Sequence, residues 1–246
     1  MPPLLEIRDL SIRFGGIAAL SDVSFDIEEG HVAGLIGPNG AGKTTCFNCI
    51  TRLYEPSGGK LTFAGENLLN RPAHQLAGMR IARTFQNVAL CDRLSTIDNV
   101  LVGYHSRYKK GAARLRRDDS GEHEARVALD YLGLSAVADR PVRGLPFGTR
   151  KMVELARALV ARPRLLLLDE PASGLTTAEV GALVDVVKRI AKDYAATIVM
   201  VEHHMQLVMN VCDHVVVLAS GRKIADGTPE TVQRDPGVIE AYLGTA

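Results

Sequence analysis

Gly37-Pro38-Asn39-Gly40-Ala41-Gly42-Lys43-Thr44 is the most informative segment of this chain, because it follows the spacing G-x-x-x-x-G-K-[ST]. It stands between an apolar run, His31–Ile36, and a helical pattern that continues to about Tyr54. Glycines let the backbone N–H groups of such a loop turn inward around phosphate oxygens, and the following helix directs its positive end at them. The stretch therefore predicts a strand, a phosphate-binding loop and a helix.

The chemistry of this loop points to a nucleoside triphosphate. We expect the Lys43 ammonium to reach the β and γ phosphates of ATP, and the Thr44 hydroxyl to ligate Mg²⁺. The alternative is a glycine-rich turn that matches by accident, and the strand and helix that flank the loop argue against it. The expected ATP-binding residues of the loop are Gly37, Pro38, Asn39, Gly40, Ala41, Gly42, Lys43, Thr44 and Thr45.

Two carboxylates follow a second apolar run. Leu165–Leu168 predicts a buried strand, and Asp169 and Glu170 come directly after it. In open α/β sheets, ligands bind at the carboxyl ends of the strands. We therefore expect Asp169 to hold Mg²⁺, directly or through water, and Glu170 to polarise an attacking water. The alternative is that the two acids only cap the next segment.

Short apolar runs alternate with helical patterns along much of the chain, which predicts an α/β fold with a mostly parallel sheet covered on both faces. The N-terminal region, with its apolar residues at Leu5, Ile7, Leu10, Ile12 and Phe14 and over Val23–Ile27, predicts strands. Further strands are expected at Thr197–Val201 and Val215–Leu218, and helices at Arg150–Ala161 and Thr177–Lys192.

The middle of the chain, from about Val88 to Leu145, lacks strand patterns and predicts a helical insertion, with helices at Ile97–Tyr104 and Glu122–Leu132. Within it, the stretch Arg107–Arg117 holds six basic residues. One interpretation is a solvated connection, and the other is a patch that faces lipid headgroups or a partner.

Composition excludes several classes of protein. The 246 residues are 46% hydrophobic and 23% charged, with a net charge of +1, so no overall field favours nucleic acid or membrane, and no nucleic-acid partner is expected. The N-terminus lacks the pattern of a signal peptide, and no apolar run is long enough to span a bilayer. Cys46 and Cys49 form a C-x-x-C, but without a second pair we expect core thiols in a reducing compartment.

With the phosphate loop and the two carboxylates in place, the chain resembles the ABC ATPase family over nearly its whole length. The resemblance implies that Phe14 stacks on adenine, that Gln86 is the Q-loop glutamine which senses Mg²⁺, and that His203 contacts the γ-phosphate. Glu170, His203, Gln86 and Lys43 are then the candidate catalytic residues, and Thr44, Gln86 and Asp169 the candidate Mg²⁺ ligands. The alternatives are a strand residue for Phe14, a surface side chain for Gln86 and a helix cap for His203.

The family signature, usually L-S-G-G-Q, is altered here to Leu145-Pro146-Phe147-Gly148-Thr149 and precedes a helix expected to begin near Arg150. In the family this segment acts in trans, on the γ-phosphate held by the other subunit of a head-to-tail dimer. Pro146 offers neither a hydroxyl nor a backbone N–H, so this contact should be weaker. The following D-loop also departs, with Thr176 where aspartate is usual.

Both departures lie in segments that, by the resemblance, act on the nucleotide of the other subunit. The residues expected to act on this chain's own nucleotide are retained, namely Lys43, Asp169, Glu170 and His203. We therefore expect the chain to pair with a different ATPase subunit that has a fuller signature, although a homodimer stays open. The resemblance implies a single ABC ATPase domain over residues 1–246, with a P-loop NTPase (RecA-like) core. Its expected parts are an N-terminal antiparallel β subdomain with the first half of the core (1–87), an inserted helical subdomain with the signature (88–148) and the second half of the core (149–246).

The ending, Gly227-Thr228-Pro229-Glu230 followed by Ala241-Tyr242-Leu243-Gly244, is similar to the LivG-type branch. That resemblance implies the ATP-hydrolysing subunit of an importer for branched-chain amino acids or related small polar solutes. The implied partners are two transmembrane permeases, a second ATPase subunit and, indirectly, a solute-binding protein, with the chain on the cytoplasmic face of the plasma membrane. The alternatives are a regulatory subunit with weak turnover, a lipopolysaccharide-export ATPase and a soluble ABC ATPase that acts on ribosomes or DNA.

Overall fold

The computed structural model describes residues 2–107 and 119–243. The chain divides into two compact units, one formed by residues 1–73 and 187–246 and the other by residues 74–186. Of the basic stretch Arg107–Arg117, only Arg107 lies within the described residues.

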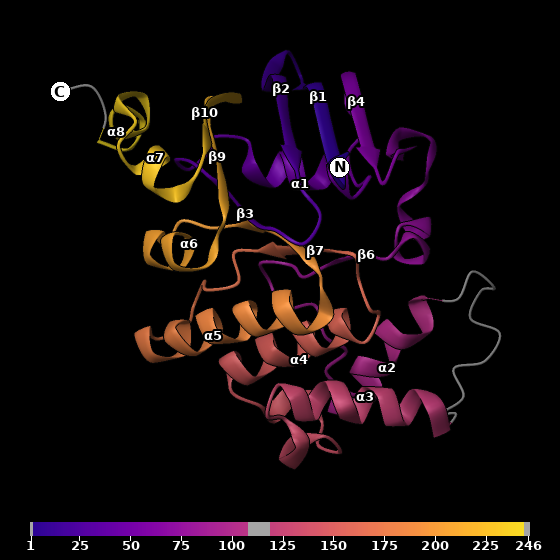
Figure 1. The fold of residues 1–246 in the computed structure, drawn as a ribbon. Helices are drawn as coiled ribbons and strands as arrows, with labels where there is room; N and C mark the ends of the chain where they lie inside the picture. Colours follow the sequence, from indigo (N-terminus) through magenta and orange to yellow (C-terminus); the bar gives the residue numbers. More distant parts are fainter. Residues whose placement is uncertain (1, 108–118, 244–246) are drawn as a thin grey trace. The chain divides into compact units, whose positions relative to one another are not determined.

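The first unit contains an antiparallel sheet built from the N-terminal strands. Its order is β2 (Ile17–Ile27), β1 (Leu5–Phe14), β4 (Gly58–Phe63) and β5 (Glu66–Asn67). Strand β1 buries Leu5, Ile7, Leu10 and Ile12 on one face, with register shifts that adjust the alternation between Ile7 and Leu10. The predicted N-terminal antiparallel β subdomain is therefore confirmed (Figure 1).

The same unit contains parallel strands whose residues are entirely or mostly buried. Strand β3 (Val32–Ile36) pairs in parallel with β8 (Thr197–Val201) and β9 (His214–Ala219), and β10 (Arg222–Gly227) runs antiparallel to β9. The helices of this unit are α1 (Lys43–Ile50), α6 (Met205–Val211), α7 (Pro229–Gln233) and α8 (Pro236–Leu243). The continuous apolar runs are thus strands of a parallel sheet, as predicted.

Helix α1 ends at Ile50, earlier than the predicted end near Tyr54. The Thr51 hydroxyl donates to the carbonyl of Phe47, and Arg52 has a φ of 59°, which an α-helix cannot continue.

The second unit combines a parallel strand pair with helices. Strand β6 (Ile81–Arg83) pairs with β7 (Leu165–Asp169). The helices α2 (Thr96–Ser106), α3 (Asp119–Tyr131) and α4 (Phe147–Leu159) lie together in Figure 1 and share one buried cluster. Its fully buried members include Ile97, Val100, Leu129, Val142 and Val153. Helix α5 (Thr177–Tyr194) follows β7 and leads the chain back into the first unit. The helices predicted at Ile97–Tyr104 and Glu122–Leu132 are present as α2 and α3.

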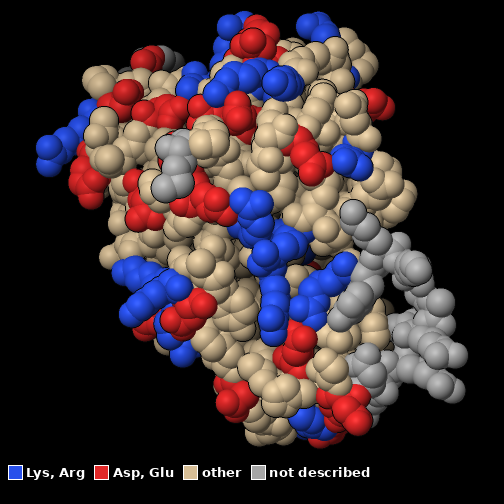
Figure 2. All heavy atoms as spheres, turned by 45° about the vertical axis from the view of Figure 1, so that its right-hand side comes forward, with Lys and Arg blue, Asp and Glu red and all other residues tan. Residues whose placement is uncertain are grey.

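The surface and the thiols agree with the composition. Acidic and basic side chains are interspersed on the face in Figure 2, and no helix among the described residues is both long and apolar enough to cross a membrane.

Cys46 and Cys49 are buried on α1, and burial raises the pKa of the Cys49 thiol to about 11. No cluster of His, Cys, Asp or Glu in the described part of the chain has a composition that could hold a metal ion. The C-x-x-C residues are therefore core side chains, as predicted.

The close approach of α2 to α4 depends on Gly103. A Cβ at this position would lie 1.9 Å from the carbonyl oxygen of Arg157. We predict that Gly103→Ala lowers the free energy of unfolding by about 1–3 kcal/mol, because it forces the two helices apart. Urea denaturation measures the change. The matched control is Gly181→Ala on α5, where a Cβ meets nothing within 4 Å and should stabilise by about 1 kcal/mol. Equal effects of the two substitutions would contradict this prediction.

Candidate functional site

The phosphate loop joins β3 to α1 in the first unit. Lys43 is the first residue of α1, and Gly42 before it has a φ of 101°, which turns the chain into the helix. The Lys43 side chain is buried, and its ammonium donates to the carbonyl oxygens of Gly37 (2.8 Å) and Pro38 (2.9 Å). The ammonium is therefore held inside the loop, where it is available to exchange these carbonyls for phosphate oxygens.

The start of this loop is constrained by β9. Gly37 has a φ of 146°, and a Cβ there would lie 2.0 Å from the carbonyl oxygen of Leu218. At the far end of the loop, the N–H of Gly221 donates to the carbonyl of Ala41 (3.1 Å), and the Gly221 carbonyl accepts from Ser21 (2.8 Å). The turn between β9 and β10 thus ties the loop to β2.

A residue of the C-terminal helix also lies against the loop. Partial burial raises the pKa of the Tyr242 phenol on α8, and the backbone N–H of Gly37 acts on this pKa in the opposite direction. In the sequence, Tyr242 stands out only as part of an ending similar to the LivG-type branch. Its place beside the phosphate loop could not be predicted, because no local pattern connects the two.

The expected adenine-stacking residue lies at the end of β1. Phe14 is 45% exposed, and its ring meets that of Tyr54 edge to face at 5.2 Å between centroids. An exposed aromatic ring at a strand end is available to stack on a base, whereas a core residue would not be. Tyr54 was missed at the sequence level because the helix prediction extended over it.

His203 lies in the segment between β8 and α6, with its ring tilted against that of His204 at 4.9 Å. Both side chains are exposed, and the N-cap of α6 is His204, not His203. The fully buried carboxylate of Glu202 accepts from the backbone N–H groups of His203 (3.0 Å) and His204 (3.2 Å). Glu202 therefore fixes this segment, a role that no sequence pattern indicated.

The second unit brings together two of the predicted catalytic residues. Gln86, which follows β6, donates from its amide Nε2 to the Glu170 carboxylate at 2.7 Å. Glu170 follows β7 and has a φ of 45°, an uncommon conformation for a side chain of this size. Because the two strands are parallel neighbours, their carboxyl ends place these side chains at one edge.

Asp169, the last residue of β7, is held by a buried ion pair. Arg83 donates to its Oδ2 at 2.6 Å, and the two side chains are 7% and 4% exposed. The sequence singled out Asp169 but not Arg83, which occupies an apolar strand where a charge is uncommon.

The altered signature forms the first turn of α4, because the helix begins at Phe147 and not near Arg150 as predicted. Pro146 is its N-cap residue, a position where the missing N–H costs nothing. Phe147 is exposed, and a Cβ at Gly148 would lie 2.3 Å from the Glu179 carboxylate. The five residues Leu145, Pro146, Phe147, Gly148 and Thr149 thus form a compact entry to the helix.

Thr176, which replaces the usual D-loop aspartate, caps the start of α5. The Thr176 backbone N–H and hydroxyl both donate to Glu179 at 2.8 Å, and the Glu179 N–H donates back to that hydroxyl. This is a reciprocal capping box at the start of α5. The backbone N–H of Thr176 is the main reason that the pKa of Glu179 is lowered.

The donor groups that a magnesium ion requires are present in kind. Mg²⁺ prefers oxygen ligands. In the second unit, Asp169 carries a carboxylate and Gln86 an amide oxygen. In the first unit, Thr44 is exposed at the start of α1 and carries a hydroxyl. Each of these groups is by itself an oxygen donor of the kind that Mg²⁺ accepts.

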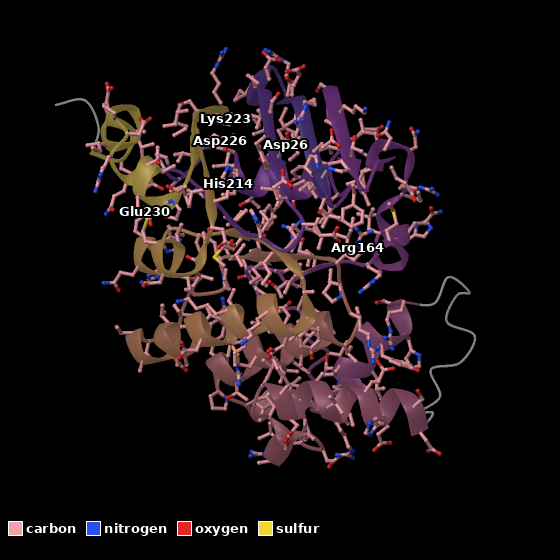
Figure 3. All side chains as sticks on the ribbon, viewed as in Figure 1. Asp26, Arg164, His214, Lys223, Asp226 and Glu230 are labelled. Atoms are coloured by element: carbon pink, nitrogen blue, oxygen red, sulfur yellow. The ribbon has the colours of Figure 1, made fainter. Side chains whose placement is uncertain are left out.

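A separate cavity of about 580 Å³ lies in the first unit, and five of the ionisable side chains that line it bond to one another. Asp226 accepts from Lys223 at 2.6 Å and pairs with His214, and Arg8 donates to Asp26. Figure 3 places His214, Lys223 and Asp226 near one another around β9 and β10. These five side chains are therefore paired with one another.

Comparison with known proteins agrees with this arrangement. A family described as "ABC transporter" matches residues 20–173, and one described as "Branched-chain amino acid ATP-binding cassette transporter" matches residues 222–246. The chain is 40% identical to the high-affinity branched-chain amino acid transport ATP-binding protein BraF of Pseudomonas aeruginosa, with 99% of each chain covered. It is 38% identical to LivG of Escherichia coli, again with 99% of each covered.

A solved structure, the ADP conformation of MJ1267, an ATP-binding cassette of an ABC transporter, is 28% identical and covers 100% of both chains with a TM-score of 0.89. The fold and the phosphate loop therefore define an ATPase that energises transport as part of an ABC transporter complex. Within that class, this chain belongs to the ATP-binding subunits of the branched-chain amino acid (LivG/BraF) type.

The buried pair of Arg83 and Asp169 generates a stability prediction. Arg83→Met leaves the Asp169 carboxylate buried without its guanidinium, so we predict a loss of about 3–5 kcal/mol in the free energy of unfolding. Adding Asp169→Asn should recover part of this loss, because it removes the unpaired charge. Urea denaturation compares both with Arg143→Met, which alters an exposed arginine of the same unit. A loss no larger than that of the control would refute the prediction.

Proposed function

We propose that this chain binds ATP through its phosphate loop, hydrolyses it with Glu170 and Gln86, and thereby powers the import of branched-chain amino acids. The observation that carries the proposal is the Lys43 ammonium, which is buried and bonded to the carbonyl oxygens of the loop itself. Phosphate oxygens are stronger acceptors for an ammonium than neutral carbonyls. When ATP binds, the Lys43 ammonium therefore exchanges its hydrogen bonds to the loop carbonyls for hydrogen bonds to phosphate oxygens, while the adenine stacks on Phe14.

In the hydrolytic step, water attacks the γ-phosphorus, the bond from this phosphorus to the oxygen shared with the β-phosphate breaks, and ADP leaves. Glu170 accepts the proton that the water loses. Gln86 orients the Glu170 carboxylate, in line with their 2.7 Å hydrogen bond. His203 stabilises the charge that develops on the γ-phosphate. Thr44, Asp169 and Gln86 are proposed to hold Mg²⁺, which when bound neutralises charge on the β and γ phosphate oxygens.

The proposed partners are two transmembrane permeases, a second ATPase subunit in a head-to-tail dimer and, indirectly, a solute-binding protein. Such a complex holds the chain on the cytoplasmic face of the plasma membrane. The names of BraF and LivG, which state branched-chain amino acid transport, support this class of solute. The solute itself is recognised by other subunits, and this chain supplies the free energy of ATP.

A test of this function uses two variants of the purified chain. Lys43→Ala should weaken ATP binding about 100-fold, since hydrogen bonds from a charged group contribute about 1.5–3 kcal/mol each. Glu170→Gln should keep ATP affinity but lower kcat by at least about 100-fold, because it removes the general base. Glu240→Gln, on the exposed face of α8, is the matched control for the second variant. Unchanged ATP affinity in Lys43→Ala would overturn the proposal.

The altered signature favours a second ATPase subunit of different sequence over a homodimer. Pro146 cannot donate a backbone hydrogen bond, and Thr176 is engaged in capping α5. The contacts that its signature and D-loop make with ATP on the other subunit are therefore weaker than the contacts that its own phosphate loop and carboxylates make. The competing function is a regulatory subunit with weak turnover.

The pairing can be tested in the assembled transporter by changing the catalytic glutamate of each ATPase subunit to glutamine in turn. We predict that Glu170→Gln in this chain removes most of the ATPase activity, whereas the equivalent change in the partner removes less. A purified chain that alone forms a fully active homodimer would contradict unequal pairing. No turnover in any assembly would favour the regulatory function.

A further inference from the structure

One face of α4 presents ionisable side chains to the interior of the second unit. Lys151 is 7% exposed and Glu154 is 3% exposed, and Arg157 lies one turn further along the helix. Lysine and glutamate are almost never this deeply buried unless they are paired. The bonds that these side chains make show what their burial achieves.

Lys151 holds the backbone that follows β7. Its ammonium donates to the carbonyl oxygens of Glu170 (2.9 Å) and Pro171 (3.1 Å). Glu170 has a φ of 45°, a conformation that costs free energy for a residue other than glycine and persists only where its surroundings enforce it. Two charge-assisted hydrogen bonds to this turn supply that enforcement.

Glu154 holds the segment that follows β6. One carboxylate oxygen accepts from the backbone N–H groups of Phe85 and Ala89, both at 3.4 Å, and from Arg157 at 3.1 Å. Arg157 in turn donates to the carbonyl of Ala89. Phe85 and Ala89 flank Gln86, so the contacts fix the loop on both sides of the glutamine.

We propose that Lys151 and Glu154 are positioning residues for ATP hydrolysis, which together set the backbone on which Gln86 and Glu170 meet. The two side chains are three residues apart on one helix and therefore share a face. A single rigid element thus fixes both partners of the 2.7 Å hydrogen bond between Gln86 and Glu170. This inference deepens the proposed function and rests on the hydrolytic role of Glu170.

The two residues should affect turnover more than ATP binding. Both bond to the segments that carry Gln86 and Glu170, whereas the proposed function assigns ATP affinity to Lys43 and its loop. A displacement of Glu170 by a fraction of an ångström is enough to slow a proton transfer that depends on geometry. A merely structural role would instead change stability without separating kcat from affinity.

The first experiment compares Lys151→Met and Lys151→Arg in the full-length chain. Methionine keeps much of the side-chain volume but donates no hydrogen bond, so kcat should fall by about tenfold or more while the Kd for ATP stays within about threefold. Arginine retains the donors and should recover part of kcat. Lys188→Met, on the exposed surface of α5, is the matched control and should leave both constants unchanged.

The second experiment compares Glu154→Leu with Glu154→Gln, and it also decides the matter if Lys151→Met fails to fold. Glutamine keeps an acceptor for Phe85 and Ala89, whereas leucine has a similar shape and none. We expect kcat to fall by about tenfold or more in Glu154→Leu but to stay within about threefold in Glu154→Gln, with thermal unfolding as the check of folding.

The outcomes separate this inference from the proposed function. Equal kcat values in Glu154→Leu and Glu154→Gln, or a wild-type kcat in a folded Lys151→Met, would overturn the positioning role while wild-type turnover keeps the ATPase function intact. Absence of ATP binding by the wild-type chain, or its persistence in Lys43→Ala, would instead overturn the proposed function.

Discussion

The phosphate loop packs so closely against β9 that a side chain at its first residue, Gly37, would collide with the backbone of the strand. Gly37 combines a φ of 146° with a position where any Cβ would lie 2.0 Å from the Leu218 carbonyl oxygen. Only glycine meets both demands, because it lacks the atom that would collide. A hydrogen bond from the Gly221 N–H to the Ala41 carbonyl holds the other end of the loop. Between these two fixed points, the Lys43 ammonium bonds to the Gly37 carbonyl, and α1 begins at Lys43. The proposed binding of phosphate by this loop rests on that local geometry.

The groups proposed for hydrolysis lie at the ends of a pair of parallel strands, and one helix holds the segments that follow these strands. Gln86 follows β6, Asp169 ends β7 and Glu170 follows it. Asp169 is held by a buried ion pair with Arg83. The backbone at Glu170 is held by a hydrogen bond from Lys151 on α4. The same helix begins with the altered signature. A chain can therefore lose the usual signature chemistry at the helix start while retaining a well-ordered carboxylate of its own.

Much of the fold could be predicted from the sequence because its strong patterns are local. The apolar runs at β3, β7, β8 and β9 are continuous, since parallel strands are buried on both faces. Strand β10 was missed because its residues are mostly exposed, and β6 because it has only 3 residues. Helix α4 begins earlier than expected because Pro146 is an N-cap, not a break.

Some residues of the candidate site could be predicted from the sequence, and others could not. Lys43 follows from a motif with a fixed spacing, Asp169 and Glu170 follow from their position directly after an apolar run, and Gln86 follows from resemblance. The roles of Arg83, Lys151 and Glu154 could not be predicted, because each depends on contacts between segments far apart in the sequence. A charged residue on an amphipathic helix is usually solvated, and only the tertiary structure distinguishes a buried one.

Amide hydrogen exchange of the full-length chain, with and without ATP, tests whether the phosphate loop binds the nucleotide. If the backbone N–H groups of residues 37–45 surround the phosphates, saturating ATP should slow exchange in the peptides that contain them, and Lys43→Ala should remove this protection. ATP binding that leaves the exchange of these amides unchanged would contradict the account.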